Sequence, residues 1–94
     1  MKWIALAAVA SIALAASGAA NAQEALAKSD GCLNCHDVSA KKVGPSFKDV
    51  AAKYKGQADA EAKLVNKISK GEGHPATKAK PEDVTSLVKW VLSQ

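Results

Sequence analysis

The feature that most constrains this chain is the hexapeptide Gly31-Cys32-Leu33-Asn34-Cys35-His36. Its two cysteines are the only ones in the chain, and a histidine follows the second directly. On a helical turn, residues three and four apart lie on one face, so both thiols and the imidazole can reach one ligand. Each thiol can add to a haem vinyl group and form a thioether. The spacing therefore predicts one covalent haem c on Cys32 and Cys35, with His36 as the proximal iron ligand. We call this hexapeptide the haem motif.

Three other kinds of site use closely spaced cysteines. A redox dithiol of the thioredoxin kind has the same spacing, but it normally lies in a βαβ setting, and this chain shows no strand pattern. A structural zinc ion needs four ligands, whereas the chain has only two cysteines and two histidines, the second being the distant His74. A disulfide across two intervening residues would close a very small loop and stabilise little. Covalent haem also agrees with the export signal that residues 1–22 suggest.

Residues 1–22 have the pattern of a cleaved secretory signal peptide. Lys2 supplies the positive charge at the start, and the run from Trp3 to Ala16 is almost entirely apolar or small. Ala20-Asn21-Ala22 matches an Ala-x-Ala cleavage site. An uncleaved membrane anchor is the alternative, but the apolar run is shorter than the ~20 residues that a spanning helix needs and is rich in alanine. The sequence therefore predicts an exported protein with a single mature domain, residues 23–94.

This mature domain is small for the hydrophobic core it can build. Phe47, Tyr54 and Trp90 are its only aromatic side chains, and domains of this size usually need a crosslink or a bound group to be stable. A haem would supply both core volume and covalent links. The whole chain carries 13 Lys or Arg against 9 Asp or Glu, for a formal net charge of +4. A net charge of +4 does not indicate the strong basic stripe that is typical of proteins that bind nucleic acid.

Hydrophobic spacing predicts an all-α domain of about four helices. Apolar side chains recur at intervals of three and four, as in Val84, Leu87, Val88 and Val91 near the C-terminus. Proline before such a segment and glycine after it mark its ends. The expected helices run from Gln23 to about Gly31, from Ser46 to about Tyr54, from Ala58 to Lys70, and from Pro81 onward.

Two further segments accompany the haem motif, namely Val43-Gly44-Pro45-Ser46-Phe47-Lys48-Asp49-Val50-Ala51 and Leu87-Val88-Lys89-Trp90-Val91-Leu92-Ser93-Gln94. Together, in this order, the three segments resemble the short monohaem class I cytochromes c of the bacterial periplasm. The resemblance covers nearly the whole mature chain. It implies helices wrapped around one haem, crossing N- and C-terminal helices, a periplasmic location, and electron transfer between respiratory proteins rather than catalysis.

The resemblance also implies roles for two residues outside the haem motif. In the family, the carbonyl of the proline after the glycine accepts the ring N–H of the proximal histidine, and here this proline is Pro45. A proline that only starts a helix is the alternative, and both roles are compatible. Lys67 falls where the family often has a basic residue near a haem propionate, whereas a solvated lysine is the simpler interpretation.

One departure from the family concerns the sixth iron ligand, which is usually methionine. Met1 is the only methionine of the chain, and it belongs to the predicted signal peptide. The family's Met-Pro pair falls on His74-Pro75, and imidazole is already mostly neutral near pH 7, so it can bind a metal at little cost. We therefore expect His74 as the distal ligand of a bis-histidine iron. A vacant or water-bound iron, or a lysine ligand such as Lys78 or Lys80, is the alternative.

Two functions are compatible with these patterns. The first is an electron carrier with a six-coordinate iron, and the second is a protein that binds or senses a small gas at an open distal site. Enzymatic activity is not expected, because the sequence shows no distal acid–base pair. We expect a monomer that binds neither nucleic acid nor, after cleavage, the membrane. Five lysines suggest docking to an acidic redox partner, with a merely solvated surface as the alternative: Lys41, Lys42, Lys48, Lys53 and Lys55.

Overall fold

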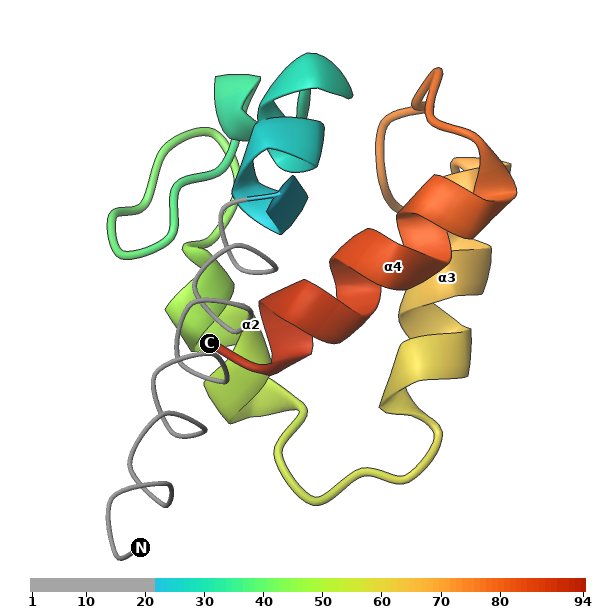
Figure 1. Cartoon of the computed structure of the whole chain (residues 1–94). Helices are drawn as coiled ribbons and strands as arrows, with labels where there is room; N and C mark the ends of the chain where they lie inside the picture. Colours follow the sequence, from blue (N-terminus) through green and yellow to red (C-terminus); the bar gives the residue numbers. More distant parts are fainter. Residues whose placement is uncertain (1–21) are drawn as a thin grey trace, which may run out of the picture.

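The computed structural model describes residues 22–94, and within this range every regular element is helical (Figure 1). Residues 22–29 are helical and form the N-terminal helix. The 3-10 helix η1 (Cys32–Asn34) follows, and then α2 (Phe47–Lys53), α3 (Ala60–Lys70) and α4 (Pro81–Leu92). The all-α prediction is confirmed. The predicted signal peptide lies outside the described residues except for Ala22, and none of the helices described is long and apolar enough to cross a membrane.

Local chemistry sets where α2 and α4 begin. The hydroxyl of Ser46 accepts a hydrogen bond from the backbone N–H of Asp49 at 3.1 Å, which satisfies one of the free donors at the start of α2. Pro81 lies in the first turn of α4, where its missing N–H costs no hydrogen bond. Glu82 and Asp83 follow it, at the positive end of the helix dipole. Both helices begin within one residue of the predicted positions.

The haem motif is not carried on a continuation of the N-terminal helix, contrary to our expectation. Helical residues end at 29 rather than at about Gly31. Gly31 has a left-handed φ of 83°, which residues with a side chain rarely adopt. This residue separates the N-terminal helix from η1, whose tighter winding is typical of short connecting turns. The attachment segment is therefore an independent short turn.

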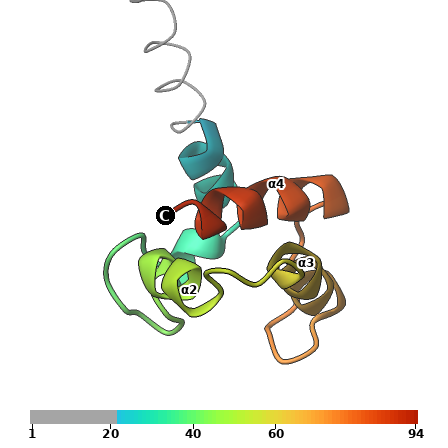
Figure 2. The same ribbon diagram turned by 90° about the horizontal axis from the view of Figure 1, so that it is seen from below.

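Helix α4 is the central element of the fold. It packs against both α2 and α3, and Figures 1 and 2 show it crossing them. Val84 and Val88 of α4 are buried in one cluster with Leu64 of α3, and burying each such side chain contributes about 1.5–3 kcal/mol. The hydroxyl of Ser86 accepts a hydrogen bond from Gln23 Nε2 at 3.1 Å. Helix α4 thus contacts the N-terminal helix as well.

The buried core of the described residues is small. Its hydrophobic members are Ala27, Phe47, Ala60, Leu64, Val84, Leu87 and Val88. Phe47 is the one aromatic side chain among them. A core of this size agrees with the expectation that the domain depends on a further group for stability.

Candidate functional site

The cysteines and the histidine of the haem motif are brought together by η1 and the turn after it. The backbone N–H groups of Cys35 and His36 both donate to the carbonyl of Cys32, at 3.3 and 3.0 Å. These bonds hold the two thiols and the imidazole on one short turn. Both cysteines are free thiols, Cys32 partly buried and Cys35 exposed. Free thiols at this spacing are what thioether attachment to a haem requires.

The environment of Cys32 favours the protonated thiol. Burial raises the pKa of this group, and the nearby Asp30 carboxylate raises it further. A protonated thiol is a poor nucleophile and a poor metal ligand. This environment does not activate Cys32 as the thiolate nucleophile that a redox dithiol uses. It is compatible with addition of an intact S–H group to a vinyl group.

His36 is held in place by the loop that follows it. Its Nδ1–H donates to the carbonyl of Pro45 at 2.6 Å, and because a carbonyl can only accept, Nε2 carries the free lone pair. The N–H of Gly44 donates to the carbonyl of Cys35 at 2.8 Å, which draws the loop against the ring. A Cβ at position 44 would lie 2.8 Å from His36 Nδ1, so glycine is required beside the imidazole. The structure thus brings Pro45 and His36 together.

Phe47 packs against the same imidazole. The ring centroids of Phe47 and His36 are 5.2 Å apart, with planes at 26°. On its other side Phe47 meets Trp90 of α4 edge-on, at a centroid distance of 5.5 Å. From the sequence we expect these aromatic residues only to pack and to shield the haem, because helical spacing does not distinguish a core aromatic from one that supports a ligand. Their contacts connect His36 to the central helix.

The structure also brings His74 close to His36. Their ring centroids are 6.1 Å apart and their planes differ by only 8°. His74 lies in the loop between α3 and α4, where Gly71 and Gly73 have left-handed φ values of 67° and 73° and turn the chain sharply. Its Nδ1–H donates to the carbonyl of Pro75 at 2.8 Å, which again leaves Nε2 free.

The separation of the two imidazoles fits a metal ion held between them. A histidine nitrogen binds a transition metal at about 2 Å, so the centroid separation of His36 and His74 leaves room for one ion that both rings would bind. In each ring, Nδ1–H is bonded to a backbone carbonyl, which is the usual arrangement for a histidine that ligates through Nε2. The donors present therefore fit the iron of a haem attached to the adjacent turn.

Lys67 lies beside the loop between α3 and α4. A Cβ at Gly73 would be 3.2 Å from Lys67 Cε and 3.9 Å from its Nζ, so the lysine stem crosses this glycine. The Lys67 side chain is exposed there. Its contact with a haem propionate stays a prediction. Lys78 and Lys80, the other lysines of this loop, are exposed as well.

A contact of Lys42 was not anticipated from the sequence. Its Nζ donates to the carbonyl of Leu33, the residue after Cys32, at 3.2 Å. Its backbone N–H donates to the carbonyl of Gly44 at 3.1 Å. Nothing in the sequence separates Lys42 from its neighbour Lys41, because the contact depends on how the loop folds back over η1.

Asp37 organises the beginning of the same loop. One carboxylate oxygen accepts the backbone N–H groups of Ser39 and Ala40, at 3.0 and 2.9 Å. The hydrogen bonds from Ala40 and Ser39, in that order of importance, lower the pKa of Asp37. The charge of Lys42 lowers this pKa further. The loop after the haem motif is therefore ordered by a charged side chain as well as by backbone bonds.

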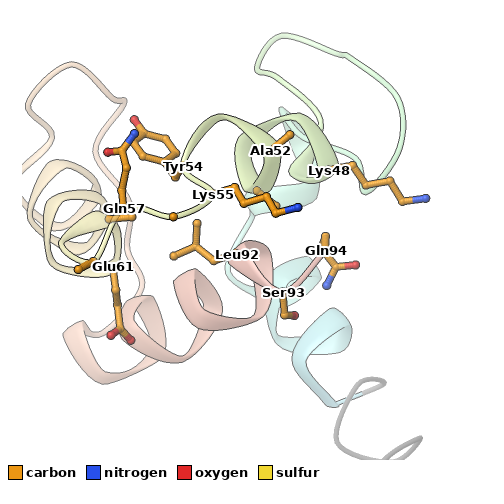
Figure 3. Close-up of a pocket in the computed structure, with 13 residues that line it drawn as sticks. Lys48, Ala52, Tyr54, Lys55, Gln57, Glu61, Leu92, Ser93 and Gln94 are labelled. Atoms are coloured by element: carbon orange, nitrogen blue, oxygen red, sulfur yellow. The ribbon is translucent and has the colours of Figure 1, made fainter.

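A groove of about 600 Å³ lies elsewhere, between the end of α2, the connection to α3 and the end of α4 (Figure 3). Its lining includes Tyr54, Lys55, Glu61 and Leu92. It contains no residue of the haem motif and not His74. The groove is therefore separate from the candidate site.

Comparison with known proteins agrees with this site. The family described as cytochrome c matches residues 19–94. Cytochrome c-551 of Pseudomonas aeruginosa is 44% identical over 89 residues, which cover 86% of this chain and 86% of that protein. Cytochrome c-552 of Hydrogenobacter thermophilus is 43% identical over 100 residues, covering 99% of this chain and 98% of that protein.

Solved structures show the same similarity. The class 1 cytochrome MtoD of Sideroxydans lithotrophicus matches with a TM-score of 0.69 and 42% identity, covering 78% of this chain and 92% of that chain. Wild-type cytochrome c552 of Nitrosomonas europaea matches with a TM-score of 0.66 and 34% identity, covering 74% of this chain and 96% of that chain.

Proposed function

Because this chain belongs to the cytochrome c family and has the class I fold, we propose that it transfers electrons through one haem c with two histidine ligands. Family membership confirms the predicted covalent haem c, and the relatives support a small electron-transfer cytochrome rather than an enzyme. The finer assignment is our proposal. It makes Cys32 and Cys35 the thioether positions, His36 the proximal ligand and His74 the distal ligand.

One observation carries the bis-histidine assignment, namely the nearly parallel rings of His36 and His74 at 6.1 Å. Residues 22–94 contain no methionine, so a thioether ligand has no source within the described part of the chain. Because a histidine lies in this place, we favour electron transfer over gas binding, which needs an open distal site. Since methionine raises the potential of such haems, we expect a lower reduction potential than in relatives with a methionine ligand.

The residues of the site have distinct tasks. The haem supplies an iron that alternates between the ferric and ferrous states. Cys32 and Cys35 fix its position on η1. The hydrogen bond from His36 to Pro45 orients the imidazole and makes its Nε2 a stronger donor, and the packing of Phe47 restricts rotation of the ring. Ligands held in this way keep their positions as the charge of the iron changes.

We also propose that the protein works in the periplasm as a monomer with acidic redox partners. The signal-peptide pattern of residues 1–22 supports export, and the relatives are bacterial c-type cytochromes. Five exposed lysines support electrostatic docking: Lys41, Lys42, Lys48, Lys53 and Lys55. Electron-transfer rates with such a partner should fall as salt rises, because added ions screen the attraction. Rates that stay constant with salt would indicate apolar docking instead.

The substitution His74→Ala tests the distal ligand. The wild-type protein should be low-spin in both oxidation states, should ignore carbon monoxide, and should lack the weak far-red ferric band of an iron–methionine bond. The His74→Ala variant should become high-spin or bind added imidazole readily. Glu72→Ala, in the same loop, is the matched control and should keep the wild-type spectrum. In all three proteins, acid–acetone extraction should leave the haem on the polypeptide.

Two results would contradict this assignment. If His74→Ala keeps an unchanged low-spin spectrum, another group such as a lysine holds the sixth position. If the colour of the wild-type protein passes into the acetone, the haem is not covalently attached. A high-spin wild-type protein that binds carbon monoxide quickly would favour the gas-binding function.

A further inference from the structure

We propose that Lys42 is a positioning residue that raises the reduction potential by holding its positive charge against the haem attachment turn. The inference rests on the proposed function, because it takes η1 as the segment that carries the haem. It goes beyond that function by assigning a role to a lysine that is neither an iron ligand nor part of the haem motif.

The contact with Leu33 is specific to the attachment turn. Within this turn, the carbonyls of Gly31 and Cys32 accept backbone N–H groups of the turn itself. The carbonyl of Leu33 instead accepts the ammonium group of Lys42, at 3.2 Å. Lys42 thus bonds to the backbone between the two cysteines that would anchor the haem.

Two hydrogen bonds hold Lys42, one at the end of its side chain and one at its backbone. Its Nζ is bonded to Leu33, and its backbone N–H is bonded to the carbonyl of Gly44 at 3.1 Å. A free lysine side chain samples many rotamers, and its charge is then spread over a large volume of solvent. Anchoring both ends of the residue confines the charge to the region of the haem motif.

A confined cation of this kind acts on the redox equilibrium. The ferric haem carries one more positive charge than the ferrous haem, so a nearby cation destabilises the ferric state more and raises the reduction potential. Asp37 is the acidic group that acts on Lys42. Its carboxylate is bonded to the N–H groups of Ser39 and Ala40, and among the described residues it forms no ion pair with Lys42.

Lys41 provides a matched comparison. It has the same charge, precedes Lys42 directly and is also exposed. Among the residues that the structure describes, its side chain forms no hydrogen bond and no salt bridge. The two lysines therefore differ in anchoring and not in charge or in sequence neighbourhood.

The experiment measures the reduction potential of the haem-loaded protein with Lys42→Met, Lys41→Met and Lys42→Arg. Lys42→Met should lower the one-electron equilibrium constant about twofold, which corresponds to roughly 20 mV. Lys41→Met should change it clearly less, and Lys42→Arg should restore the wild-type value. The difference between the two methionine variants should shrink at high salt.

Amide hydrogen exchange gives a second readout that does not depend on electron transfer. The N–H groups of Cys35 and His36 should exchange faster in Lys42→Met than in Lys41→Met, because the turn loses its bond at Leu33. Equal potentials in the two methionine variants, or a failure of arginine to restore the potential, would overturn the proposal. The low-spin spectrum should be the same in all variants, so failure of the bis-histidine assignment would be seen separately in His74→Ala.

Discussion

The two histidines are held by different kinds of structure. On the proximal side (residues 31–48), hydrogen bonds join residues distant along the segment: His36 bonds to Pro45, and the N–H groups of Phe47 and Lys48 donate to the carbonyls of residues 37 and 38, at 2.9 and 3.1 Å. On the distal side (residues 67–80), the ring of His74 bonds only to the next residue, Pro75. The proposed proximal ligand is part of the scaffold, whereas the proposed distal ligand is carried by a loop.

This difference has a consequence for ligand identity. His36 cannot be replaced without disturbing its surroundings, because Gly44, Pro45 and Phe47 all lie against its ring or bond to it. The loop of His74 depends on two glycines with left-handed φ and on bonds between near neighbours. The residue at position 74 can therefore change while the helices stay in place, since loops tolerate change better than packed elements.

Removal of the haem anchors should produce the largest effect, because it acts on both sides at once. The double substitution Cys32→Ala, Cys35→Ala should yield a protein without covalent haem and with little cooperative unfolding, since the core of the described residues is small. Thermal unfolding followed by circular dichroism measures this. His74→Ala, which keeps both thioethers, is the control and should still unfold cooperatively. A sharp transition in the haem-free double variant would show that the helices are stable alone.

Alanine substitutions at Gly44 and Gly73 test the proximal side and the distal side independently. Gly44→Ala places a Cβ against the His36 ring, and overpacking of this kind costs about 1–3 kcal/mol. Gly73→Ala meets only the flexible end of Lys67 and has a left-handed φ of 73°, which costs roughly 1–2 kcal/mol. We expect both variants to lose stability in denaturant titrations.

The absorption spectrum should then distinguish these two glycine variants. Gly44→Ala should disturb the iron spectrum, because the ring of His36 has to move. Gly73→Ala should disturb the spectrum less than Gly44→Ala does, since its Cβ meets the movable end of Lys67 and not an imidazole. The reverse result, a disturbed spectrum in Gly73→Ala alone, would mean that the distal side is the more rigid one.

The smallest effect concerns the pH dependence of the proximal loop. The pKa of Asp37 is lowered in the folded protein by the N–H groups of Ala40 and Ser39. In the unfolded chain, Asp37 therefore binds its proton at a higher pH, near the ordinary pKa of about 3.9. The stabilisation is complete above that value and is lost as the pH falls through the lower pKa of the folded state. The melting temperature of the wild type should drop more steeply below about pH 4 than that of Asp37→Asn. Parallel curves for the two proteins would exclude Asp37 as a contributor.

Much of the fold was predictable because local rules and tertiary packing agree. The apolar spacing of α4, the proline at its start and the glycine after α3 each indicate the element that the structure contains. The haem motif was predictable for the same reason, since its chemistry depends on three residues within a single turn. The predicted end of the N-terminal helix was too late, because the left-handed Gly31 separates this helix from the two cysteines.

Contacts that depend on how a loop folds could not be predicted from the sequence. The bond from Lys42 to Leu33 and the packing of Phe47 on His36 require the loop after the motif to fold back over η1. Periodicity describes only which face of a helix is apolar, so it cannot tell which side chain across a loop will meet a backbone carbonyl. The placement of His74 came from the family resemblance rather than from spacing.

The central position of α4 has a consequence for the order of folding. This helix is the last element of the chain, and it makes the contacts that join α2, α3 and the N-terminal helix. During synthesis, the packing of α2 and α3 against α4 cannot form until residues 81–92 have emerged. The bonds that shape η1, by contrast, are all local to residues 31–36 and need no partner. The attachment turn can thus form while the rest of the chain is still open, with both thiols within reach of the haem.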